Sequence, residues 1–144
     1  MRWRLSLVGA CLAAGLVQGC WAKSCEEVGC NSGATVTISS LETDDIRKIH
    51  ACLDGDCSEL SWTVAAVCTS TNGESPDLSA CSLDGDVVEL RVIESDVRDG
   101  DVLSVRVEGE SVVLLEEERT LEYKDSYPNG KDCPGHCRVA SVEL

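Results

Sequence analysis

The amino-acid sequence predicts an all-β protein, a disulfide-stapled antiparallel β-sandwich of about seven to eight strands. Apolar and polar residues alternate with period two through most of the chain after Gly33, which is typical of half-buried strands. Asp-Gly and Asn-Gly pairs lie near these alternating runs, at positions where short hairpins turn. Eight cysteines lie beyond residue 20, and in an exported chain of this size that even number indicates four disulfides.

The alternation is clearest in the segment VVELRV. Here Val88, Leu90 and Val92 share one face, while Glu89 and Arg91 share the other. In an antiparallel sheet with one buried face, the apolar set turns toward the core. On this pattern the expected strands span residues 35–39, 47–53, 60–66, 87–92, 102–108, 111–115, a stretch around 120–123, and 138–144.

Two stretches are less regular. The segment 41–49, LETDDIRKI, fits either a helical turn with Thr43 as its cap or a loop that leads into a strand, and we expect the loop. In the last strand Val142 falls out of phase with Val139, which suggests a bulge. The chain has no Phe, so its core is expected to be light in aromatic residues, with Trp62 buried in it.

The segment CLDGDC predicts a stapled hairpin. With Asp54 and Gly55 as the central residues of a type I′ turn, the residues beside them form the first cross-strand pair. Cys52 and Cys57 are then the next pair, which is non-hydrogen-bonded and close enough for a disulfide. Short turns are also expected at Asp99-Gly100, at Gly109-Glu110, and in YPNG, residues 127–130.

The other six cysteines are assigned by their positions. Cys68 and Cys81 are expected to close the polar loop between them. Two cysteines near the start of the mature chain and two near its end predict the pairs Cys25–Cys133 and Cys30–Cys137, with the crossed arrangement as the alternative. A zinc site made by these four thiolates with His136 is a further alternative, although an oxidising compartment favours disulfides.

The first residues are expected to form an export signal. Arg2 and Arg4 precede the uncharged apolar run 5–17, which is too short to span a bilayer as a stable helix. The run ends in Val17-Gln18-Gly19-Cys20, with an aliphatic residue three positions before the cysteine and a small residue directly before it. In these residues the chain resembles bacterial lipoprotein precursors.

That resemblance implies cleavage before Cys20 and lipidation of its sulfur. The chain then divides into a lipoprotein signal peptide (1–19), a lipidated cysteine with a short tether (20–24) and a single β-sandwich domain (25–144). The implied location is the bacterial cell envelope, where the lipid on Cys20 attaches the domain to a membrane. Ordinary secretion, with cleavage after Ala22, is the alternative. The domain itself resembles small cysteine-rich sandwiches of the Ig-like or transthyretin-like kind, by fold-level analogy.

The charge of the chain limits its partners. Twelve basic and 26 acidic side chains give a formal charge of −14. Removal of residues 1–19 leaves ten basic side chains against the same 26 acidic ones, a charge of −16. Such a surface argues against nucleic acid, because phosphate binding needs Lys and Arg to replace counterions. The charge is expected to serve solubility alone, and a cationic protein partner or bound cations are the alternatives.

The recurring Asp-Gly-Asp segments are the strongest hint of a cation site. Their glycine follows the first aspartate directly, unlike the spacing of an EF-hand loop, so each is expected to be a turn and no metal ligand is assigned. A weak cation site would require these turns to gather at one end of the sandwich. Its ligands would then be Asp54, Asp56, Asp84, Asp86, Asp99 and Asp101.

Little in the sequence indicates catalysis. No G-x-S-x-G motif is present, and the only histidines are His50 and His136, both expected to be structural or on the surface. The acidic run Glu116-Glu117-Glu118 is expected to be a solvated strand edge. No catalytic residue and no cofactor is therefore assigned.

These observations favour a non-enzymatic envelope lipoprotein. Its sandwich would be a structural or protein-binding module that works near the membrane, through its loops or an exposed strand edge. The alternative is a ligand- or calcium-binding secreted or surface module. A small hydrolase is a distant third.

Overall fold

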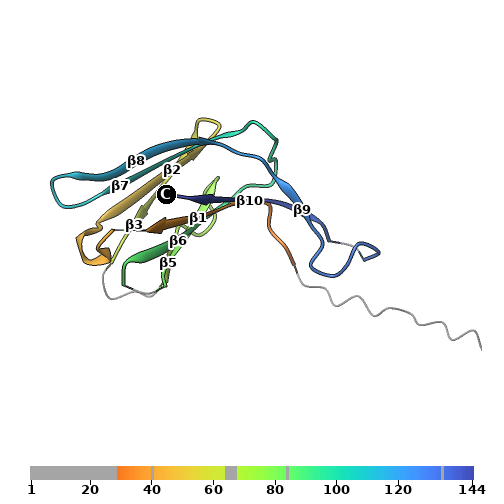
Figure 1. The fold of residues 1–144 in the computed structure, drawn as a ribbon, viewed down its shortest axis with the longest axis horizontal. Coiled ribbons are helices and arrows are strands. Elements are labelled where there is room, and N and C mark those ends of the chain that lie inside the picture. Colours follow the sequence, from red (N-terminus) through yellow and green to blue (C-terminus); the bar gives the residue numbers. More distant parts are fainter. Residues whose placement is uncertain (1–28, 40, 64–67, 84, 134) are drawn as a thin grey trace, which may run out of the picture.

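The chain is an all-β sandwich, as predicted, in a computed structural model that describes residues 29–39, 41–63, 68–83, 85–133 and 135–144 (Figure 1). Ten strands and one 3₁₀ turn lie in these residues. They are β1 (Gly33–Ser39), η1 (Thr43–Asp45), β2 (Lys48–Leu53), β3 (Asp56–Ser61), β4 (Cys68–Ser70), β5 (Asp77–Ser82), β6 (Val87–Ile93), β7 (Val102–Glu108), β8 (Val113–Thr120), β9 (Lys124–Ser126) and β10 (Cys137–Glu143). The additional strands beyond the expected seven or eight include the three-residue strands β4 and β9.

The strands form two sheets. The six-stranded sheet has the order β4-β5-β6-β1-β10-β9, and the four-stranded sheet has the order β3-β2-β7-β8. All pairs are antiparallel apart from β1 and β10, which run parallel in the centre of the larger sheet. The first and last strands of the described chain are therefore neighbours.

The core follows the alternation in the sequence. Val88, Leu90 and Val92 of β6 are fully buried, while Arg91 between them is exposed. Trp62 is 5% exposed, as expected for a core residue. Further buried residues come from both sheets: Val36, Ile38, Ile49, Ala51, Leu78, Ala80, Leu103, Val105 and Val107. Burial of both inner faces is what joins two sheets into a sandwich.

The segment after β1 forms a helical turn, and the expectation of a simple loop was wrong. The turn η1 has Glu42 as its N-cap, so Thr43 is the first residue of the turn and not its cap. Ile46, directly behind the turn, is fully buried. The turn brings this apolar side chain into the core, and the hydroxyl of Thr43 donates to the carbonyl oxygen of Gly85 at 2.8 Å.

The C-terminal third also differs from the expectation. No strand covers 121–123, because the chain crosses there from β8 in one sheet to β9 in the other. The register of β10 against β1 is continuous, so β10 has no bulge on that side. The irregularity lies instead between Val107 and Glu108, where β7 pairs with β8.

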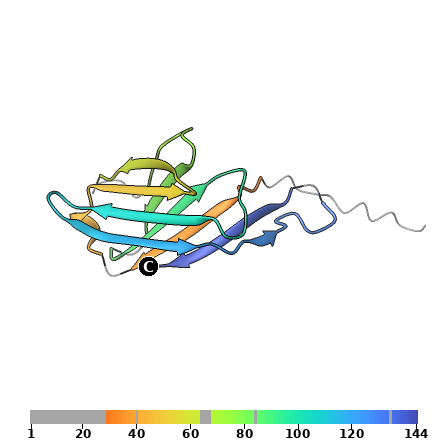
Figure 2. The same cartoon turned by 90° about the horizontal axis from the view of Figure 1, so that it is seen from above.

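The two ends of the sandwich carry different features (Figure 2). The turn η1 and the β5–β6 and β7–β8 turns lie at one end, since Thr43 reaches Gly85 and Gly109 lies beside the carbonyl of Asp45. The other end holds β9 and the disulfide between Cys30 and Cys137. The start of the described chain, next to Cys30, therefore lies at the end opposite η1.

Candidate functional site

The third Asp-Gly-Asp segment forms a corner that joins β6 in one sheet to β7 in the other. The short hairpin expected at Asp99-Gly100 is therefore not present. Asp101 is 6% exposed, and its Oδ2 accepts the backbone N–H of Arg98 at 2.8 Å. The same Oδ2 lies 3.4 Å from the hydroxyl of Tyr123, which donates to it. These donors satisfy a carboxylate that would otherwise be costly to bury.

The corner also holds the segment 121–123, which crosses between the sheets. Gly100 donates its N–H to the carbonyl of Leu121 at 2.9 Å, and Leu121 donates to the carbonyl of Asp101 at 2.8 Å. The N–H of Tyr123 donates to Oδ1 of Asp99 at 2.8 Å. Three bonds thus fix the path of a segment that has no strand partner of its own.

The contacts at the corner shift two pKa values. The pKa of Asp99 is lowered, first by the N–H of Tyr123 and then by the hydrogen bond from Arg138. The pKa of Tyr123 is raised, first by burial of its hydroxyl and then by the nearby charge of Asp101. Both shifts favour the protonation state in which each group makes its bond at neutral pH.

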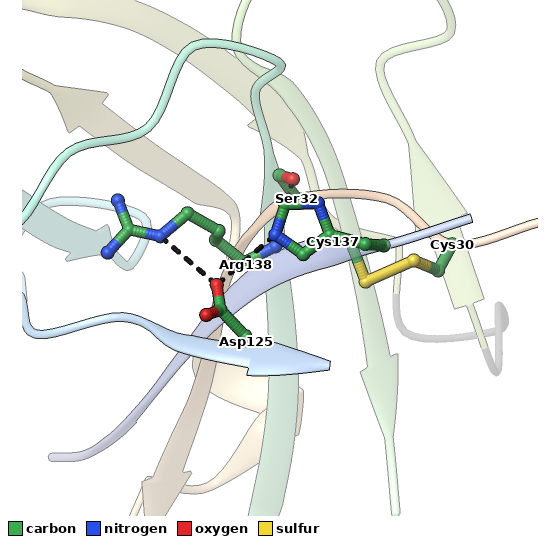
Figure 3. The surroundings of a disulfide bond; sticks show 6 residues. Cys30, Ser32, Asp125, Cys137 and Arg138 are labelled. Atoms are coloured by element: carbon green, nitrogen blue, oxygen red, sulfur yellow. Dashed lines mark hydrogen bonds and ion pairs between the residues drawn. A yellow bond between two sulfur atoms is a disulfide. The ribbon is translucent and has the colours of Figure 1, made fainter. Parts of the chain in front are cut away.

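Arg138 links this corner to the disulfide between Cys30 and Cys137. Figure 3 shows Arg138 with Asp125, Ser32 and this disulfide. Its Nη2 donates to Oδ2 of Asp99 at 2.9 Å, and its Nε lies 3.7 Å from Oδ1 of Asp125. Its backbone N–H donates to Oγ of Ser32 at 3.1 Å. The guanidinium carbon lies 5.7 Å from the centre of the Tyr123 ring, within the range of a cation–π contact. Strand β10 is thus fastened at its start.

The first Asp-Gly-Asp segment is the predicted hairpin turn. Asp54 and Gly55 have φ angles of 52° and 94°, as a type I′ turn requires, and Cys52 pairs with Cys57 across it. Oδ1 of Asp54 accepts the N–H of Val102 at 3.1 Å. The side chain therefore also ties this hairpin to the start of β7.

The described aspartates of the three Asp-Gly-Asp segments do not gather at one place. The first and third segments border a common hollow of about 340 Å³, which Arg98 also lines. The second segment lies at the opposite end, where Gly85 contacts η1; its Asp84 lies outside the described residues. Backbone N–H groups bind carboxylate oxygens of Asp54, Asp99 and Asp101. Among the described residues, no group of three or more His, Cys, Asp or Glu has the arrangement of a metal site.

Three disulfides join the pairs that the sequence predicts: Cys52–Cys57, Cys68–Cys81 and Cys30–Cys137. Their Cα atoms lie 3.9, 4.1 and 5.8 Å apart, respectively. A disulfide between Cys30 and Cys137 rules out the crossed pairing and the zinc site, because these two sulfurs bind each other. Cys133 is also disulfide-bonded. Its predicted partner Cys25, like the lipidation candidate Cys20, lies outside the described residues.

The two histidines lie apart. His50 sits on β2 between Glu59 and Glu108, with ring nitrogens 3.4 and 3.3 Å from their carboxylates. His136 is exposed, stacks on Tyr127 with ring centres 5.4 Å apart, and lies 3.2 Å from Asp125. Each histidine therefore has acidic or aromatic neighbours within the fold.

The acidic run lies on an edge strand, as predicted, because β8 is the last strand of the four-stranded sheet. Pairing with β7 places Glu117 and Arg119 opposite the core residues Val105 and Leu103. Glu117 and Arg119 form an ion pair of 2.6 Å on this inward side. Inward-pointing charges on an edge strand discourage the pairing of a further strand.

The edge of β10 is organised differently. Strand β9 pairs only with Cys137–Val139, and no other strand in the described part of the chain pairs with 140–143 on the side away from β1. We call this stretch, Ala140–Glu143, the open edge. A groove of about 370 Å³ runs beside it. The groove is lined by Thr120, Leu121, Glu122, Lys124, Val139, Ala140, Ser141 and Val142.

The open edge is the candidate binding site, and sequence reasoning did not locate it. The sequence marked β10 as a strand, but its residues Ser141 and Val142 carry no motif. The alternation of Leu121 and Tyr123 with Glu122 indicated a strand around 120–123, and both apolar side chains are indeed buried. No strand forms there, because the chain crosses from β8 to β9, and β9 then pairs only with the start of β10.

Comparisons with known proteins identify no relative. No protein-family model matches the chain, and no curated protein and no solved structure matches it. In the part of the chain that the structure describes, no helix is both long enough and apolar enough to cross a membrane.

Proposed function

We propose that this chain is a non-enzymatic lipoprotein of the bacterial cell envelope whose β-sandwich binds another protein close to the membrane. The observation that supports the binding role most directly is the open edge, Ala140–Glu143, beside its groove. An unpaired sheet edge presents backbone donors and acceptors that an extended segment of another protein can pair with. Natural proteins usually shield such edges, as β8 does with its charges.

The disulfides support export. Such bonds persist in oxidising compartments and are rare in a reducing cytosol. The bond between Cys30 and Cys137 begins only ten residues after Cys20, so a lipid on Cys20 would hold the domain close to the bilayer. At that distance the sandwich stands beside other membrane-attached proteins.

The lipid anchor is tested in bacteria that express the full chain. Cells are grown with a labelled fatty acid, and the wild type is compared with Cys20→Ala and with Cys11→Ala as the matched cysteine control. We expect the wild type and Cys11→Ala to carry the label and to sediment with membranes, and Cys20→Ala to carry none. Label on Cys20→Ala, or none on the wild type, would contradict the lipoprotein assignment.

The binding role is tested separately, by cross-linking in living cells. A photoreactive residue replaces one exposed residue at a time, at Ser141 and Glu143 on the open edge and at Glu74, Glu110 and Arg119 elsewhere. We expect one discrete adduct from the open-edge positions and none from Glu74. Absence of an adduct from all five positions would argue against a protein-binding role.

A further inference from the structure

We propose that the open edge of β10 binds an extended basic segment of a partner protein as an added β-strand. This inference rests on the protein-binding role proposed above and names the chemistry of the partner. Three features of the open edge carry it: its unpaired backbone groups, its apolar inner side and its acidic surroundings.

The backbone of β10 offers bonding groups on its outer side. Leu144 donates its N–H to the carbonyl of Thr37, and its own carbonyl accepts the N–H of Ser39, both at 2.9 Å. Because alternate residues of a strand bond to opposite sides, the N–H and C=O groups of Ser141 and Glu143 point away from β1. An added strand would find two donors and two acceptors there.

The inner side of the open edge is apolar. Ala140 and Val142 pair with Ala34 and Val36, whose side chains lie in the core. Val142 and Leu144 pack against the core but stay partly exposed. Alternate side chains of an added strand would cover them and extend the core. The charged inner side of β8 offers no such surface.

The surroundings are acidic. Glu122 lines the groove and Glu143 is exposed on the open edge itself, while Lys124 is the single basic residue in the groove lining. The whole chain carries a formal charge of −14. A basic segment is attracted to this surface, whereas a second copy of the chain would bring its own Glu122 and Glu143 against them.

The probe is a short synthetic peptide of about nine residues with alternating Lys and Val, long enough to pair along the edge. Its affinity for the disulfide-bonded domain is measured by fluorescence anisotropy. Three matched peptides serve as controls. One carries Glu in place of Lys, and the other two are N-methylated at alternate residues in opposite phases, so that each lacks the backbone donors of one side. The amide signals of Ser141 and Glu143 are followed by NMR.

Two kinds of variant test the edge itself. Ser141→Pro removes an outward N–H that no strand among the described residues uses, and proline is tolerated at such positions. Glu122→Lys with Glu143→Lys reverses the local charge, and Glu74→Lys, on a distant loop, is the matched control. If Ser141→Pro fails to fold, the charge variant and the N-methylated peptides carry the test.

We expect Ser141→Pro and N-methylation in one phase to weaken binding about tenfold or more, and the double charge reversal to weaken it about tenfold at low salt. Glu74→Lys should retain wild-type affinity, apart from its small effect on net charge. Equal binding of the Glu peptide would overturn the basic preference. Unchanged binding by Ser141→Pro and by the charge variant, or self-association of the chain through β10, would overturn the site. The cross-linking and labelling results would still stand, so failure here is distinct from failure of the proposed function.

Discussion

The same tripeptide, Asp-Gly-Asp, builds two unlike structures in this molecule. In residues 54–56 it forms the tight turn of the β2–β3 hairpin. The disulfide between Cys52 and Cys57 closes this hairpin at the second cross-strand pair from the turn. In residues 99–101 it is a corner between the two sheets, held by hydrogen bonds to a segment more than twenty residues away. The glycines are alike, with φ angles of 94° and 96°. The aspartates that follow them differ in burial and in their hydrogen bonds.

The two segments are stabilised by different interactions. Asp56 is exposed, and the local geometry of the turn and the disulfide would hold the hairpin without it. Asp101 is buried and binds two donors. The corner therefore depends on the aspartate, whereas the hairpin depends on the glycine and the cysteines.

Removing the disulfide beside the corner should produce the largest effect, and removing the disulfide of the hairpin gives the matched comparison. Cys30 and Cys137 close a separation of 107 residues next to Arg138, and Cys52 and Cys57 close a separation of 5. In the chain-entropy model these correspond to about 4–5 and about 2 kcal/mol of unfolding free energy. Urea unfolding of Cys30→Ala/Cys137→Ala and of Cys52→Ala/Cys57→Ala measures both. Equal losses would show that the hairpin contributes more than its short loop allows.

The buried acid should give the next largest effect. Asp101→Ala leaves the N–H of Arg98 and the hydroxyl of Tyr123 without their acceptor, so we expect a loss of about 2–3 kcal/mol. Asp56→Ala, the equivalent change in the hairpin, should lose less than about 0.5 kcal/mol. Asp101→Asn keeps an acceptor and should fall between them. Equal losses for the two alanine variants, measured by urea unfolding, would remove the distinction between corner and hairpin.

The sequence predicts a segment well when its contacts are close in sequence, and poorly when its contacts are distant in sequence. The hairpin follows from residues 52–57 alone, because turn type and register are local properties, and both were predicted correctly together with the Cys52–Cys57 bond. The corner was expected to be a hairpin as well. Its partners Tyr123 and Arg138 lie 24 and 39 residues from Asp99, and no local rule connects them.

The candidate binding site was beyond prediction for the same reason. Whether a strand has an open edge depends on which strands lie beside it in the sheet. The parallel pairing of β1 with β10 joins residues about a hundred positions apart. Alternation identified β1, β2, β6, β7 and β10 as strands, and it placed Trp62 in the core. It does not tell which strand ends a sheet. The acidic run on β8 was recognised as an edge because charge itself marks that role.

Substitution of the glycine should lower the stability of the hairpin and of the corner by similar amounts, because the φ angles of the two glycines are nearly the same. Gly55 and Gly100 have positive φ, and nothing lies within 4 Å of an added Cβ at either position. Gly55→Ala and Gly100→Ala should each lose about 1 kcal/mol through backbone strain alone. Gly55→Asn should lose less, since Asn tolerates this region better. Unequal losses for the two alanine variants in urea unfolding would mean that one turn relaxes and the other does not.

The smallest effect should appear in acid, at the exposed acid of the corner. The pKa of Asp99 is lowered in the folded chain by the N–H of Tyr123 and by Arg138. A depressed pKa adds stability above the unfolded value, and this stability is lost as the pH falls through the folded value. The melting temperature of the wild type should therefore fall more between pH 5 and 2 (about the range in which carboxylates titrate) than that of Asp99→Asn, whose amide oxygen still accepts the N–H of Tyr123. Asp56→Asn is the matched control, because it removes a carboxylate without touching Tyr123 or Arg138. If Asp99→Asn kept the full acid dependence of the wild type, the charge of Asp99 would have no part in holding the corner, and the hydrogen bond to its oxygen would be sufficient.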